Sequence, residues 1–184
     1  MEIVLFIILN MLKKRLGLEA IERSRLFSSI KIPSSLIIPE GCVRIGNWAF
    51  WGCRWLKEVI IPKSVVEIGM CAFEGCERLE KIEIPESVKE IGFEAFENCI
   101  KLKKVKIPES VKRLGYATFK NCKNLREIEI PGSVKVIGIE AFRNCDNADI
   151  TLKKAKNKFN IGSRAFEGCK DIRYIKYAKE EIRD

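Results

Sequence analysis

Histidine is absent from the 184 residues of this chain. Its absence removes the side chain that most often acts as a general base near neutral pH, the imidazole metal ligand, and every Ser-His or Cys-His pair. The cysteines include no Cys-x-x-Cys pair, so the usual zinc and redox spacing is missing too. No glycine-rich phosphate loop is present either. We therefore expect a protein that is not an enzyme, with no catalytic residues, no metal site, no cofactor and no small-molecule substrate.

The chain also lacks any long block of like charge. Lys and Arg number 34 against 25 Asp and Glu, which gives a formal charge of +9, but the two signs alternate along the sequence. Basic and aromatic residues are not interleaved as in nucleic-acid-binding surfaces. We do not expect nucleic acid as a partner, and weak binding to nucleic acid or acidic surfaces stays a remote alternative.

Only one strongly apolar run exists, residues 3–12, interrupted by Asn10. Ten helical residues span about 15 Å, half the hydrocarbon thickness of a bilayer, so a transmembrane helix is not expected. Basic residues follow this run rather than precede it, and no small-residue cleavage site comes after it, unlike a typical secretory signal. We expect residues 1–26 to form an apolar helix that caps the first repeat. An atypical signal, a membrane-surface anchor through residues 3–12 and a mis-assigned start are the alternatives.

Three residue types recur with one period of 23 residues. Glycine stands at Gly46, Gly69, Gly92, Gly115 and Gly138, proline at Pro39, Pro62, Pro85, Pro108 and Pro131, and cysteine at Cys53, Cys76, Cys99, Cys122 and Cys145. A fixed period of this length predicts a solenoid of stacked, near-identical units. We assign residues 27–178 to this solenoid, with irregular first and last repeats, and residues 179–184 to a polar C-terminal tail.

One repeat, residues 76–98, indicates how each unit folds. Ile82-Glu83-Ile84 alternates apolar and charged residues, which predicts a short strand with one buried face, and Pro85 ends it. We expect Gly92 to adopt a backbone conformation that is costly for other residues. Ala95, Phe96 and Cys99 follow at helical spacing, which predicts a short helical turn at the back of each unit. One phenylalanine per unit should form a core column: Phe50, Phe73, Phe96, Phe119, Phe142 and Phe166.

The periodic cysteines, with Cys169 in the last repeat, should form a column of parallel side chains. Parallel Cβ vectors disfavour disulfides, so we interpret these thiols as small buried core residues. Free thiols favour a reducing compartment, and hence a cytoplasmic location; the cell surface or secretion is the alternative.

The full pattern, Leu-x-x-Ile-x-Ile-Pro-x-Ser-Val-x-x-Ile-Gly-x-x-Ala-Phe-x-x-Cys, resembles the BspA-type leucine-rich repeat over residues 36–177. The resemblance implies an α/β solenoid with a parallel β-sheet on one face and short helical turns on the other. It also implies surfaces that bind proteins, and some members of the family are adhesins. The expected function is therefore non-catalytic protein–protein interaction with a partner of unknown identity, with a cell-surface adhesin for host or matrix proteins as the alternative.

Two outward columns on the predicted sheet are the first candidate for a partner-binding surface. One column reads Glu58, Lys81, Lys104 and Glu127, with Tyr174 further on, and the other reads Ile60, Glu83, Lys106 and Glu129. Most vertical neighbours have opposite charge. The alternative is a solvated face whose charge ladders contribute about 0.2–1 kcal/mol per pair to stability.

The residues that follow the periodic glycines are the second candidate. Met70, Phe93, Tyr116 and Ile139 occupy this position in four successive repeats, and we call them the post-glycine stripe. If they point outward, four large apolar groups form a contact patch flanked by charge. The alternative is that they pack on the convex side between the helical turns.

Overall fold

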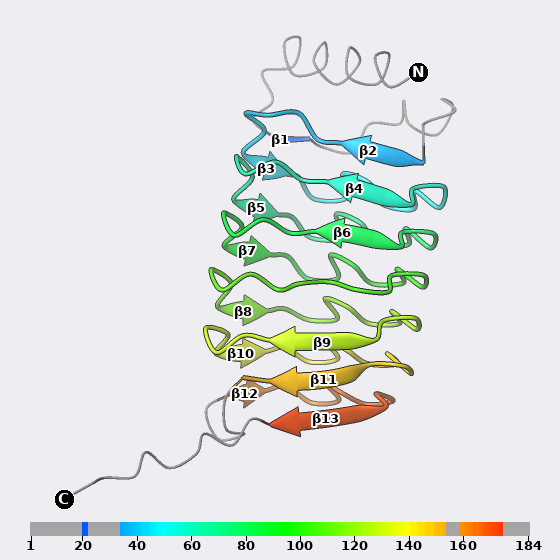
Figure 1. The fold of residues 1–184 in the computed structure, drawn as a ribbon, viewed down its shortest axis with the longest axis vertical. Coiled ribbons are helices and arrows are strands. Elements are labelled where there is room, and N and C mark those ends of the chain that lie inside the picture. The colour runs from blue at the N-terminus through cyan, green and yellow to red at the C-terminus, as the bar shows by residue number, and fades with distance from the viewer. Residues whose placement is uncertain (1–19, 22–33, 154–158, 175–184) are drawn as a thin grey trace, which may run out of the picture.

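The computed structural model describes residues 20–21, 34–153 and 159–174. In this part, each repeat forms one coil, that is, one circuit of the backbone around the core, and the coils stack along a single axis (Figure 1). All strand pairs are parallel. The predicted leucine-rich-repeat solenoid with a parallel sheet is confirmed.

The first series of strands carries the pattern that the sequence predicted. Its members are β2 (Ser35–Ile37), β4 (Glu58–Ile60), β6 (Lys81–Glu83), β9 (Glu127–Ile130), β11 (Asp149–Leu152) and β13 (Asp171–Tyr174). They form two three-stranded sheets, β2-β4-β6 and β9-β11-β13. In the coil between β6 and β9, Lys104 makes only an isolated bridge to Lys81. Like charges directly opposite each other destabilise a sheet, and the ladder is interrupted at this point.

A second series of two-residue strands runs beside the first (Figure 1), and the sequence analysis missed it. Its members are β1 (Ala20–Ile21), β3 (Arg44–Ile45), β5 (Glu67–Ile68), β7 (Glu90–Ile91), β8 (Arg113–Leu114), β10 (Val136–Ile137) and β12 (Asn160–Ile161). The sheets are β1-β3-β5-β7 and β8-β10-β12. Each of these strands except β1 lies just before a glycine, and the turns at the back of the coil follow it.

The core is a set of identical side chains stacked on one another. Neighbouring rings of the phenylalanine column are stacked with centroids between 5.2 Å (Phe50–Phe73) and 5.8 Å (Phe142–Phe166) apart. The predicted aromatic column is therefore confirmed. The periodic cysteines lie beside it, and from Cys76 to Cys169 each thiol donates to the backbone oxygen of a phenylalanine, as Cys99 Sγ does to Phe73 O at 3.2 Å. Burial raises the pKa of Cys53 to about 11. The interpretation of these thiols as small buried core residues is confirmed for Cys53 to Cys145, whereas Cys169 is half-buried and packs against the core.

The predicted helical turn at the back of each coil is wrong, because no residue of the described ranges is helical. Two residues on this side of each coil have positive φ; in the coil of Phe96 they are Glu94 (58°) and Asn98 (59°). A left-handed residue every four positions interrupts a right-handed helix. The amides bond to the next coil instead: Phe73 N donates to Ala95 O at 2.8 Å, and Phe96 N donates to Thr118 O at 2.9 Å. The back of the solenoid is a run of turns linked from coil to coil.

The expected role of the periodic glycines is wrong as well. Gly92 does not have a positive φ. It is required by close approach, because a Cβ atom at Gly92 would collide with the backbone of Gly69 and Met70 in the preceding coil. The glycine column is thus a place where the backbones of successive coils approach closely.

Ala20 and Ile21 form β1, which pairs with β3, so the stack includes part of the range 1–26 that we assigned to an apolar helix. The predicted cap at residues 3–12 and the predicted tail at 179–184 lie outside the described residues. The division into 1–26, 27–178 and 179–184 stays a prediction. Among the described residues, no helix has the length and apolar character needed to cross a membrane.

Candidate functional surfaces

In the column predicted to begin at Glu58, the strand register confirms the first neighbours and corrects the residues that follow Glu127. Glu58 lies opposite Lys81, and Lys81 lies opposite Lys104. Below the interruption, Glu127 lies opposite Asp149. The column therefore continues through Asp149, and Tyr174 does not belong to it, because Tyr174 pairs in register with Leu152, a buried position.

In the second column the register confirms only the first predicted pair of neighbours. Ile60 lies opposite Glu83, and below the interruption Glu129 lies opposite Thr151, which in turn lies opposite Arg173. We call the outward residues of both columns the sheet face.

Ion pairs on the sheet face run partly sideways rather than along the columns. Lys81 Nζ lies 3.2 Å from Glu83 and 3.6 Å from Glu58, and the hydrogen bond to Glu83 raises the pKa of Lys81. Lys106 contacts Glu86 at 2.8 Å instead of Glu83. The predicted ladder of opposite charges along the columns is therefore formed only in part.

A depression of about 470 Å³ marks the interrupted part of the sheet face. Lys104, Lys106, Glu127 and Glu129 lie in its lining, together with Asp149 and Arg173. Within the described ranges, neither Lys104 nor Glu127 forms a salt bridge. This surface carries both signs of charge.

The post-glycine stripe points outward. Phe93 is 49% exposed, Tyr116 40% and Ile139 51%, whereas Met70 is half-buried. Their backbone explains the direction: Phe93 O accepts from Cys71 N at 2.9 Å, and Tyr116 O accepts from Glu94 N at 2.9 Å. These bonds hold the main chain between coils and leave the side chains on the outside. The stripe therefore does not pack between helical turns.

Basic residues border the stripe. A depression of about 910 Å³ beside Met70 and Phe93 is lined also by Lys89, Lys112 and Arg113. No salt bridge among the described residues involves these three cations. Glu67 and Glu90 also line the depression, but Glu67 is neutralised by Arg44 at 2.9 Å. Exposed aromatic groups and unpaired positive charge thus meet on one surface.

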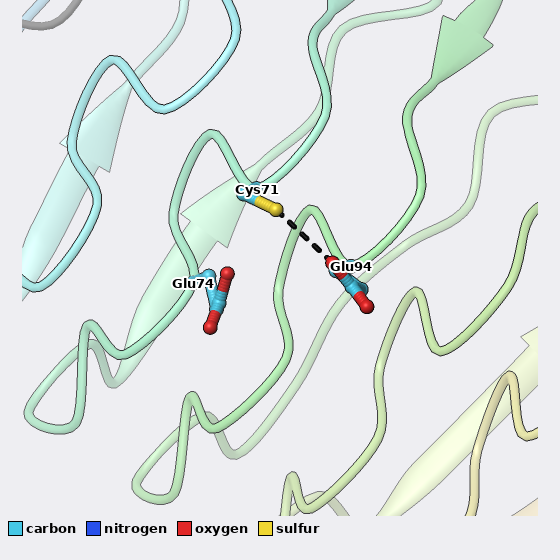
Figure 2. Close-up of side chains that lie close together, drawn as sticks. All are labelled: Cys71, Glu74 and Glu94. Atoms are coloured by element: carbon cyan, nitrogen blue, oxygen red, sulfur yellow. Dashed lines mark hydrogen bonds between the residues drawn. The ribbon is translucent and has the colours of Figure 1, made fainter.

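A third group was missed by the sequence analysis. Cys71 from one coil and Glu94 from the next lie side by side with Glu74 (Figure 2), and Cys71 Sγ donates to Glu94 Oε2 at 3.2 Å. Their ligand atoms all lie within 4.8 Å of one another. One signal was available in the sequence: Cys71 is off the 23-residue cysteine period, so the core column does not account for it.

The fold and the repeated pattern define a leucine-rich repeat solenoid. The model of the BspA type leucine rich repeat region matches residues 19–149 and 137–183, with six copies. The chain belongs to the BspA-type leucine-rich repeat family. Leucine-rich repeat solenoids of this kind are generally non-catalytic scaffolds for protein interaction. No curated protein matches the chain.

Solved bacterial structures share the fold. A leucine-rich repeat protein from Eubacterium ventriosum is 23% identical, with a TM-score of 0.66 over 80% of this chain and 46% of its own. The T. pallidum leucine rich repeat protein TpLRR is 28% identical, with a TM-score of 0.61 over 76% of this chain and 72% of its own. The pneumococcal vaccine antigen PcpA is 30% identical, with a TM-score of 0.60 over 73% and 34%. This chain therefore spans less than half the length of the first and the third of these proteins.

Proposed function

We propose that the chain is a non-catalytic binding protein whose post-glycine stripe docks an acidic protein segment with apolar anchors. One observation carries this proposal: Phe93, Tyr116 and Ile139 are 40–51% exposed in three successive coils. Contiguous apolar patches on a soluble protein mark interaction sites, and aromatic residues are enriched among the residues that dominate binding.

The charge beside the stripe selects the partner's chemistry. Lys89, Lys112 and Arg113 border the depression next to Phe93 and have no acidic partner within the described part of the chain. An approaching carboxylate finds these cations unpaired, whereas on the sheet face it would compete with Glu83 for Lys81 and with Glu86 for Lys106. Complementary charge also speeds association. An acidic segment with aromatic or aliphatic anchors fits this surface.

The test is a selection of random displayed peptides on the immobilised full-length chain. We expect enrichment of acidic peptides that contain aromatic or aliphatic anchors. These peptides should bind a Phe93→Ser/Tyr116→Ser variant at least about thirtyfold more weakly, the effect of losing one anchor worth about 2 kcal/mol. The matched control is a Lys81→Glu/Lys104→Glu/Lys106→Glu variant, which changes the sheet face and should bind as the wild type does.

Unchanged binding to a folded stripe variant would overturn this proposal. Binding lost only in the Lys81→Glu/Lys104→Glu/Lys106→Glu variant would move the interface to the sheet face and also reject it. Because both variants change exposed residues, their far-ultraviolet circular dichroism and unfolding free energies should match the wild type, which separates loss of binding from loss of fold.

A second candidate is the same binding role outside the cell, as an adhesin. Similarity to a protein described as a pneumococcal vaccine antigen favours it, whereas eight free cysteines favour a reducing compartment. Added protease should digest a tagged full-length chain on intact cells if it is displayed. Complete protection, with digestion only after lysis, would reject display and support the cytoplasm.

A further inference from the structure

The group formed by Cys71, Glu74 and Glu94 joins a buried thiol to two carboxylates from adjacent coils (Figure 2), and it is the one such group in the part of the chain that the structure describes. Cys71 is 4% exposed, and its Sγ donates to Glu94 Oε2 at 3.2 Å. Glu74 and Glu94 are half-buried. The thiol is therefore buried, and its hydrogen bond is directed to a carboxylate of this cluster.

The cluster lacks a counter-charge. In the described part of the chain, no Lys or Arg forms a salt bridge with Glu74 or Glu94. Burial raises the pKa of the nearby Glu97, the charge of Lys120 lowers it, and the charges of Glu94 and Glu74 raise it again. Negative charge in a partly desolvated place favours a bound proton or cation.

Glu140 occupies the position of Glu94 two coils further on, and there the chain supplies cations that neutralise the carboxylate. Glu140 follows Glu94 in the same column of left-handed residues, and it is only 8% exposed. Lys120 contacts it at 2.8 Å and Arg143 at 2.7 Å. Lys120 and Arg143 occupy the column position that Glu74 occupies in its own coil. The coils of Lys120 and Arg143 therefore place a cation at this position, whereas the coil of Glu74 places another carboxylate there.

We propose that Cys71, Glu74 and Glu94 bind one thiophilic divalent cation, with zinc as the ion that best fits this donor set. Zinc accepts thiolate and carboxylate ligands together, whereas magnesium and calcium take oxygen ligands only. In a tetrahedral zinc site, bonds of about 2.0–2.3 Å place the sulfur and oxygen ligand atoms about 3.5 Å from one another, so rotation of a glutamate side chain must shorten the longer separations in this cluster. Three protein ligands leave the fourth position of the tetrahedron to water.

Binding exchanges one proton for one metal ion. The Cys71 thiol gives its proton to solvent, the sulfur electron pair forms the bond to the metal, and each glutamate adds one oxygen without a further proton change. The apparent affinity should therefore increase with pH, because the competing proton is removed.

Cobalt(II) is the probe, because thiolate ligation of cobalt gives a charge-transfer absorption band that carboxylates alone do not give. Titration of the reduced, metal-free full-length chain should develop this band and saturate at one equivalent, and one equivalent of zinc should then remove it. The Cys71→Ser variant should lose the band. The matched control is Cys42→Ser, which changes the other cysteine outside the period; Cys42 is also buried and donates to Arg44 O at 3.1 Å.

Two further variants keep the test valid if Cys71→Ser folds poorly. Glu74→Gln and Glu94→Gln preserve shape, and each should weaken cobalt binding at least about tenfold, an effect that loss of even an outer-shell partner can have. The absence of a saturable band, or a band that survives in Cys71→Ser or disappears in Cys42→Ser, would overturn the proposal. Binding of calcium with no effect of Cys71→Ser would also reject it, because it would reveal only a diffuse acidic surface.

Discussion

The two sides of each coil follow opposite rules. At the core position, Phe50, Phe73, Phe96, Phe119 and Phe142 are the same residue in every coil, and each is at most 2% exposed. At the position after the glycine, only a few residues away, successive coils carry Asn47, Met70, Phe93, Tyr116, Ile139 and Ser163. An inward side chain packs on its own copy above and below, so one shape must fit itself. An outward side chain meets mostly solvent, which leaves it free to vary and to serve binding.

The largest effect should come from the core column. Phe96→Ala removes a ring stacked 5.4 Å from Phe73 and 5.2 Å from Phe119 and leaves a cavity between two coils. We expect a loss of about 3–5 kcal/mol of unfolding free energy, measured by urea denaturation. Phe96→Leu keeps most of the volume and should cost clearly less. Equal losses in the two variants would show that the cavity does not govern the cost.

The glycine column offers the next test, because two glycines of the same column differ in what a methyl group would meet. At Gly92 the added Cβ collides with backbone atoms, whereas at Gly115 it meets the ring of Phe93. A half-exposed ring can move aside and a backbone cannot. Gly92→Ala should therefore cost about 1–3 kcal/mol, the usual range for overpacking, and Gly115→Ala clearly less. The unfolding free energies of Gly92→Ala and Gly115→Ala, measured by heat or urea, test this prediction. A larger loss in Gly115→Ala than in Gly92→Ala would contradict the close-approach explanation.

A ladder of amide side chains should give a smaller effect. Asn121 Nδ2 donates to Asn98 Oδ1 at 2.8 Å, and Asn144 Nδ2 donates to Asn121 Oδ1 at 2.9 Å. Asn121→Gly keeps the left-handed backbone, which glycine already provides at Gly52 and Gly75, and removes only these bonds. We expect a loss of about 1–2 kcal/mol from two hydrogen bonds.

Asn121→Ala should cost more than Asn121→Gly, because alanine also strains a positive φ. If the two variants have the same unfolding free energy, the backbone conformation does not contribute.

The smallest expected effect is a change in acid sensitivity. The hydrogen bond from Lys120 holds the pKa of Glu140 below its ordinary value, with Arg143 adding to it. A carboxyl whose folded pKa is lowered stabilises the fold above its unfolded pKa and loses that contribution as the pH falls through the folded pKa. Glu140→Gln should therefore flatten the decline of unfolding free energy on the acid side.

Glu97 works in the opposite direction, since its pKa is raised. The wild type and Glu140→Gln both retain Glu97, but Lys120 contacts both acids, so the difference between the two profiles reports the shared Lys120 ion pairs and not Glu140 alone. An identical pH profile from neutral to acid pH would contradict the predicted role of Lys120.

The sequence was sufficient to predict the side chains that point into the core at the same position of every repeat. The period of proline and of the Ile-x-Ile pattern located the longer strands, and the phenylalanine and cysteine columns followed from their spacing. The second sheet was missed because two-residue strands such as Glu90–Ile91 are too short for an alternating pattern. The helical turn was wrong because Ala95, Phe96 and Cys99 satisfy helical spacing, whereas their backbone donors bond to the next coil.

The sequence does contain one signal for the residues of positive φ at the back of each coil. The residue before each periodic cysteine is Gly or Asn, the two types that adopt positive φ most readily. No such signal exists at Glu94 or Ala117, whose conformation is imposed by the stack. For the candidate surfaces, exposure of the stripe depended on backbone bonds between coils, and the approach of Cys71 to Glu94 depended on the same register. Neither follows from spacing alone.

The most direct test compares three outward residues with one inward residue. The unfolding free energy of a Phe93→Ala/Tyr116→Ala/Ile139→Ala variant should stay within about 1.5 kcal/mol of the wild type, since exposed substitutions cost about 0.5 kcal/mol each. Phe96→Ala alone should cost more than all three together. If the triple variant loses as much stability as Phe96→Ala, the stripe is part of the packing that holds the coils together. The separation of an inward side for folding from an outward side for binding would then be wrong.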